Sequence, residues 1–186
     1  SGQIGDKMVW SPDFNLKRNF PRITALNSHD RFHTINMDLT NCYNESLAVK
    51  SIKRNLAVFN SGIVLGCDKI ILRKNERIEW NLHSYGIIKK LAESRNFLIQ
   101  EKNIKADLYF LNDYELFEQG LTPFVPGYPN AGKRDRFLKI INHGTEAQFI
   151  YLLKIYDGTN KFKFEFEKKN GDFWSLYFMD KNEKYR

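Results

Sequence analysis

Hydrophobic and polar residues alternate along much of this chain, and short turn sequences interrupt the alternation about every ten residues. The clearest run, KFKFEFE at 161–167, puts three phenylalanines on one side, and RIEWNLHS at 77–84 has the same period of two. This period is typical of a β-strand with one buried face. The predicted turns between such strands are Asn60-Ser61-Gly62, Lys74-Asn75, Lys102-Asn103, Asp157-Gly158 and Asn170-Gly171.

Composition supports an all-β fold. Phe, Trp and Tyr make up 15% of the 186 residues, and aromatic side chains suit pleated, half-buried surfaces. The one stretch with some helical spacing, YGIIKKLAES at 85–94, favours a strand slightly over a short helix. We therefore predict an antiparallel two-sheet β-sandwich of many short hairpin-linked strands, with at most one short helix, forming a single domain over 1–186.

The formal net charge of +7 favours a polyanionic partner, although solubility alone is an alternative explanation. The chain has no ribonucleoprotein motif, helix-turn-helix or zinc knuckle, so we expect no nucleic acid. No apolar run approaches the ~20 residues of a membrane helix, so we expect no membrane partner. Because the chain begins with Ser1, we expect a processed product or an excised piece of a longer protein.

Signatures of catalysis and metal binding are weak. No Gly-x-Ser-x-Gly elbow is present, and Cys42 and Cys67 fit no metal spacing and are read as free thiols. His29 and His33 have the spacing of a zinc pair on a helix, but in a strand they would lie ~13 Å apart. We predict no metal site and no catalytic residue here.

A polar row and a long loop remain as candidate sites. Arg77, Glu79, Asn81 and His83 alternate with Ile78, Trp80 and Leu82, so they form the solvated face of a strand or, at His83, a site at its end. The proline-rich segment 121–135 is the longest predicted loop. It either carries function or covers a sheet edge.

Several segments, in order, resemble the β-sandwich domain of heparinase II/III-type polysaccharide lyases. Residues 38–70 resemble an Asp-Leu-Thr-x-x-Tyr segment that leads to an arginine-bearing strand and then to a strand with an Asp turn. IEWNLHS at 78–84 resembles the next strand, which often reads Trp-x-Leu-His. Residues 104–123 and 136–158 resemble later strands, and residues 1–10 resemble a segment that follows the family's histidine-rich region.

The resemblance implies a function. These bacterial, periplasmic or secreted enzymes cleave uronate-containing polysaccharides such as heparin, heparan sulfate or alginate by β-elimination. Their main catalytic groups come from an N-terminal helical toroid, and their zinc site comes from a His-x-His segment. Neither occurs in this chain, so the resemblance implies a C-terminal portion that is inactive alone, holds no cofactor and partners the helical domain of the same polypeptide.

The predicted contacts with an acidic polysaccharide are His83, Arg54, Lys133, Arg134 and Arg136. His83 falls where the family has a histidine, and we expect it to line a cleft or to be structural rather than to act as the base. A stand-alone carbohydrate-binding module, with aromatic side chains as sugar platforms, is the alternative function. A structural domain without a ligand is a third.

Overall fold

The computed structural model describes residues 20–43, 47–91, 95–122, 135–157, 163–168, 174–180 and 183–185. The chain divides into two compact units, Ser1–Ile155 and Tyr156–Arg186. Each unit is described by itself.

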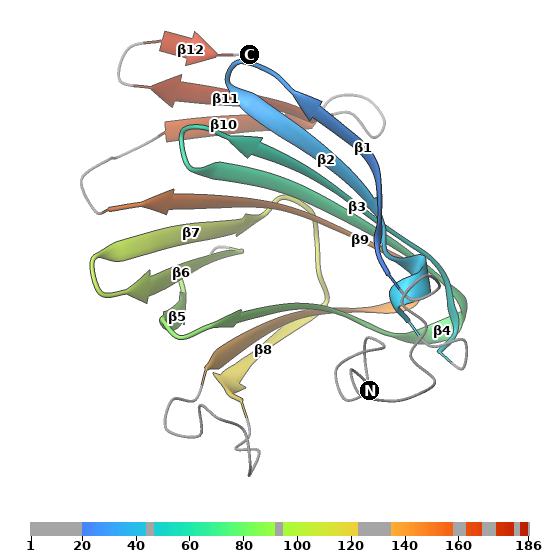
Figure 1. Ribbon diagram of the computed structural model, residues 1–186. Helices are drawn as coiled ribbons and strands as arrows, with labels where there is room; N and C mark the ends of the chain where they lie inside the picture. The colour runs from blue at the N-terminus through green and yellow to red at the C-terminus, as the bar shows by residue number, and fades with distance from the viewer. Residues whose placement is uncertain are drawn as a thin grey trace. The chain divides into compact units, whose positions relative to one another are not determined.

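The first unit contains one nine-stranded sheet, with strand order β1-β2-β3-β4-β9-β7-β6-β5 and with β8 paired to β9 (Figure 1). The pairings with a described register are all antiparallel. The strands are β1 Arg22–Ser28, β2 Phe32–Asp38, β3 Val49–Phe59, β4 Ile63–Ser84, β5 Ile87–Lys90, β6 Asn96–Glu101, β7 Ile104–Phe110, β8 Leu116–Leu121 and β9 Arg136–Tyr156. A 3-10 turn, η1 Thr40–Cys42, is the only helical element among the described residues.

The all-β antiparallel prediction is confirmed, but the predicted sandwich of two separate sheets is wrong. Two strands are far longer than expected, because β4 has 22 residues and β9 has 21. The predicted turn at Lys74-Asn75 does not separate two strands. Instead β4 continues through it, and the β4–β9 register shifts between Ile71 and Glu76.

This irregularity explains how one sheet replaces two. Ile71 pairs with Glu146 and Glu76 pairs with Gly144, so extra residues on β4 face a single residue of β9. Such bulges bend a sheet and increase its twist. Gly144 has a φ of 147°, a backbone conformation that residues other than glycine rarely adopt. Both long strands therefore curve together, as Figure 1 shows.

The core of this unit lies between parts of the bent sheet. Trp80 on β4 meets Phe110 on β7 edge-on at 5.2 Å, and Phe117 on β8 meets Phe97 on β6 at 5.5 Å. Side chains from the β4–β8–β9 region thus pack against those from β5, β6 and β7. The buried cluster contains Ile78, Trp80, Ile88, Phe97, Leu108, Phe110, Leu138, Ile140, Ala147, Phe149 and Tyr151.

Most predicted turns and strands in this unit are confirmed. Gly62, with a φ of 79°, closes the turn between β3 and β4, and the Lys102-Asn103 turn joins β6 to β7. The segment that favoured a strand over a helix forms β5. Trp80 is buried, as its place in the alternating pattern predicted.

The second unit contains an antiparallel sheet of three strands, β10 Lys163–Lys168, β11 Trp174–Asp180 and β12 Glu183–Tyr185. Phe164 pairs with Phe178 and Phe166 pairs with Leu176. The predicted strand pairing around Asn170-Gly171 is therefore confirmed, although that turn itself and Phe162 lie outside the described residues.

Candidate functional site

The polar row of β4 lies on the outer face of the sheet, opposite the core. We call Arg77, Glu79, Asn81 and His83 the outer row. Arg77 makes ion pairs with Glu79 at 2.7 Å and with Glu118 of β8 at 2.9 Å, and Lys139 of β9 lies 3.1 Å from Glu79. Most of this row is therefore a solvated ladder of ion pairs, which is what alternation on an antiparallel sheet predicts. Exposed pairs of this kind contribute little stability.

His83, at the end of the row, has a different environment. Its Nδ1 lies 2.7 Å from an oxygen of Asp135 and 3.5 Å from the hydroxyl of Thr122. Thr122 follows β8, Asp135 precedes β9, and the backbone N–H of Thr122 donates to the carbonyl of Asp135 at 2.9 Å. We call these three residues the His83 cluster. It lies between the end of β8 and the start of β9.

The cluster controls which nitrogen of His83 carries a proton. Hydrogen bonds from Thr122 and then from His83 lower the pKa of Asp135, so this carboxylate is ionised and only accepts hydrogen bonds. Nδ1 must therefore carry the proton that lies between His83 and Asp135. In the neutral ring, Nε2 then keeps its lone pair. With its side chain 53% exposed, His83 can accept a hydrogen bond from a ligand.

The structure brings only part of the predicted contact set together. Arg136 pairs with Ser84, the residue after His83, so both predicted residues reach the same end of the sheet. Alternation puts Arg136 and His83 on opposite faces there. Lys133 and Arg134 lie outside the described residues, and their role stays a prediction.

Arg54 lies elsewhere, on β3, and is held by Asp68 of β4. Its Nε and Nη2 donate to the two carboxylate oxygens of Asp68 at 2.7 and 2.6 Å. This bidentate bond raises the pKa of Arg54. The Asp68 side chain is 4% exposed and that of Arg54 is 37% exposed. One side of the guanidinium is thus committed to the protein, while contact with a polysaccharide stays a prediction.

Tyr151 of β9 lies close to the Arg54–Asp68 ion pair. Its ring lies directly over Gly66, where a Cβ atom would come within 2.2 Å of a ring carbon. Burial, and next the negative charge of Asp68, raise the pKa of Tyr151 to about 12. Tyr151 is therefore a neutral core side chain at ordinary pH, and the arrangement around Asp68 reads as structural.

A second histidine–carboxylate pair lies further along β9. The backbone N–H of His143 donates to one oxygen of Glu115 at 2.9 Å, and Nδ1 lies 2.6 Å from the other. The backbone N–H of Glu115 donates to the Asn142 side chain at 2.9 Å. These bonds attach the start of β8 to β9 and occupy both oxygens of Glu115.

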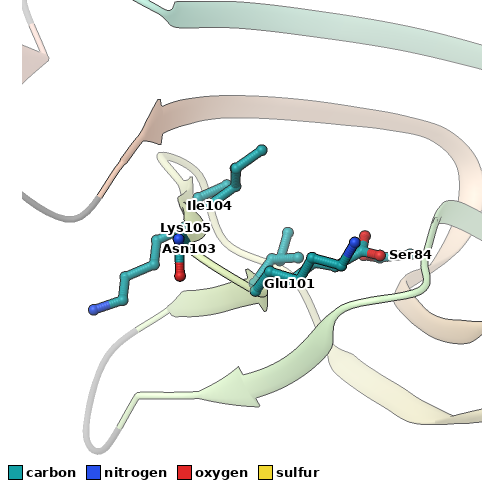
Figure 2. A pocket seen from close by; sticks show the side chains of 8 residues that line it. Ser84, Glu101, Asn103, Ile104 and Lys105 are labelled. Carbon is teal, nitrogen blue, oxygen red and sulfur yellow. The ribbon is translucent and has the colours of Figure 1, made fainter.

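A shallow hollow of about 500 Å³ surrounds the β6–β7 turn. Lys105 points away from Ser84 in Figure 2. Ser84 follows His83 on β4 and belongs to the opposite face of that strand. The hollow is therefore separate from the His83 cluster. Its lining residues are Ser84, Ile99, Glu101, Lys102, Asn103, Ile104, Lys105 and Ala106.

Sequence reasoning missed Thr122 and Asp135, and the turn expected at Asp68 is wrong because Asp68 lies within β4. Thr122 and Asp135 stand near the two ends of the proline-rich loop. A loop that joins neighbouring antiparallel strands brings its ends together, so this pair could have been found from the sequence. Asp68 interrupts an apolar strand, and such a residue requires a buried partner.

In the part of the chain that the structure describes, no group of three or more His, Cys, Asp or Glu side chains could hold a metal ion. No helix among the described residues is long and apolar enough to cross a membrane. Cys42 and Cys67 are free thiols, as predicted.

No protein-family model matches the sequence, and no curated protein matches it. Solved structures do match. A mutant of the heparan sulfate lyase HepC from Pedobacter heparinus superposes with a TM-score of 0.63 and 11% identity, over 89% of this chain and 27% of that one. A heparinase III superposes with a TM-score of 0.58 and 16% identity, over the same 89% and 27%.

These matches confirm, at the level of the fold, the resemblance inferred from the sequence. The chain has the fold of a β-rich part of heparinase III and HepC, and it spans about a quarter of the length of those lyases.

Proposed function

We propose that this chain is the C-terminal β-rich portion of a longer polysaccharide lyase of the heparinase II/III type, which cleaves uronate-containing polysaccharides by β-elimination. One observation carries the proposal. The fold matches 89% of this chain to only 27% of a heparan sulfate lyase, which supports reading the chain as one part of a larger catalyst.

β-Elimination next to a uronate carboxylate needs three things. The carboxylate must be neutralised, a base must remove the neighbouring proton, and the leaving oxygen must be protonated. The described residues supply no complete set of these groups. The described residues can offer supporting contacts, and we expect the portion to be inactive by itself.

His83 is the strongest of these contacts. Asp135 holds its Nδ1, and the exposed ring can accept a hydrogen bond from a hydroxyl of the substrate through Nε2. Lys133, Arg134, Arg136 and Arg54 remain proposed contacts, but Arg136 lies on the opposite face of the sheet from His83 and Arg54 lies on β3, so these two contact other parts of a bound polysaccharide. The net charge of +7 attracts an acidic polysaccharide, and this attraction weakens as salt screens it.

The proposal is tested with the polypeptide encoded by the complete gene. This protein and the present chain are incubated with heparan sulfate and with alginate, and the unsaturated uronate product is followed by ultraviolet absorbance. We expect product from the complete protein and none from this chain. If the complete protein forms no unsaturated product on any uronate polysaccharide, the lyase assignment is wrong. Binding without elimination would then support a stand-alone carbohydrate-binding module.

A further inference from the structure

An aromatic side chain lies on the outer face of the sheet, beside His83. Phe137 of β9 pairs in register with His83 of β4 on one side and with Gly120 of β8 on the other. A Cβ atom at Gly120 would lie 3.1 Å from two carbons of the Phe137 ring. The ring therefore lies against the strip of backbone that Gly120 leaves bare.

The surroundings of this ring are polar. The next residue, Leu138, is fully buried on the core face, so alternation puts Phe137 on the outer face. Phe137 is half-buried there, next to Asn81, His83 and Lys139. The Lys139 ammonium lies over the ring, 5.7 Å from its centroid, so a sugar that stacks on this ring would also contact Lys139. Ile141, four residues further along β9 on the same face, is fully buried, whereas Phe137 is left half-exposed among polar groups.

This combination suits a sugar ring. The face of an aromatic ring is negative, so it attracts the slightly positive C–H groups on the flat face of a pyranose. A few polar groups around an apolar contact then fix the orientation of the ligand. His83 and Asn81 offer such groups beside Phe137. Lys139 is paired with Glu79 at 3.1 Å, so the local charge is nearly balanced.

We propose that Phe137, laid against Gly120, is a stacking platform for a pyranose ring of a polysaccharide, with Asn81 and His83 bonding its hydroxyls. This rests on the proposed function only in taking a polysaccharide as the ligand. Because stacking rather than charge provides the contact, its contribution persists at high salt, unlike that of exposed lysines and arginines.

The experiment measures binding of heparan sulfate and alginate oligosaccharides to this chain by calorimetry, at low and high salt. Phe137→Leu keeps an apolar side chain and removes the ring, and Gly120→Val displaces the ring without removing it. Each variant is expected to weaken binding about tenfold, or about 1.4 kcal/mol, at both salt concentrations. The matched control is Phe117→Leu, the same change on the core face of β8, which lowers stability and leaves affinity unchanged.

Three results would overturn the platform: wild-type affinity in Phe137→Leu, a loss seen only at low salt, or no binding by the wild-type chain. The role of Phe137 would then be to cover Gly120 in the sheet. These results are independent of the elimination assay on the complete protein. If the complete protein shows lyase activity but Phe137→Leu binds as tightly as wild type, the proposed function stands and the stacking platform is wrong.

Discussion

The buried ion pair between Arg54 and Asp68 makes a sharp prediction, because its two partners differ greatly in exposure. The Asp68 carboxylate is 4% exposed, whereas the Arg54 side chain is 37% exposed. Removing the arginine leaves a buried charge without compensation. Removing the carboxylate leaves an arginine that water can still reach. Arg54→Met should therefore destabilise the fold more than Asp68→Asn does.

The magnitudes follow from the same geometry. Breaking a buried pair so that a charge stays buried costs about 3–5 kcal/mol, and we expect about 3 kcal/mol for Arg54→Met. Losing hydrogen bonds to a group that can be rehydrated costs about 1–2 kcal/mol, which applies to Asp68→Asn. Replacing both partners, as Arg54→Met with Asp68→Leu, should return the free energy of unfolding to within about 1 kcal/mol of wild type.

Urea unfolding followed by circular dichroism measures all three variants. With a slope of roughly 2 kcal/mol per M, the Arg54→Met midpoint should fall by about 1.5 M. Equal losses in the two single variants, or a larger loss in Asp68→Asn, would refute the argument from burial. A double variant as unstable as Arg54→Met would show that the cost is not an uncompensated charge.

Three further predictions concern stability. A hydrogen bond from Lys53 is the main cause that lowers the pKa of Asp38 from 3.8 to about 2. Wild type should therefore be more stable than Asp38→Asn above about pH 4, and this difference in the free energy of unfolding should vanish towards about pH 2. Urea midpoints measured across this pH range check it. Gly66→Ala should lower stability by about 1–3 kcal/mol, measured by thermal melting, because the new Cβ meets the ring of Tyr151; an unchanged melting temperature would contradict this packing. Lys102→Gly should raise stability by about 0.5–1 kcal/mol, because it relieves a φ of 53° at the β6–β7 turn, and a lower urea midpoint would count against strain there.

Local chemistry explains why much of the fold was predictable. Period-two alternation identified the strands, and turn residues such as Gly62 marked where several of them end. The burial of Trp80 followed from its neighbours in the pattern. The number of sheets did not follow, because the residues around Lys74-Asn75 suit a turn and also suit a bulge in a long strand. Only pairing with β9 selects the bulge.

The candidate site divides in the same way. His83 stood out from the sequence because it ends a polar row, and this row is set by residues two apart on one strand. Its partners Thr122 and Asp135, and the seating of Phe137 against Gly120, join residues that are distant along the chain. A strand's own sequence determines which side chains share a face. The register between strands determines which of them meet, and that depends on the packing of the whole sheet.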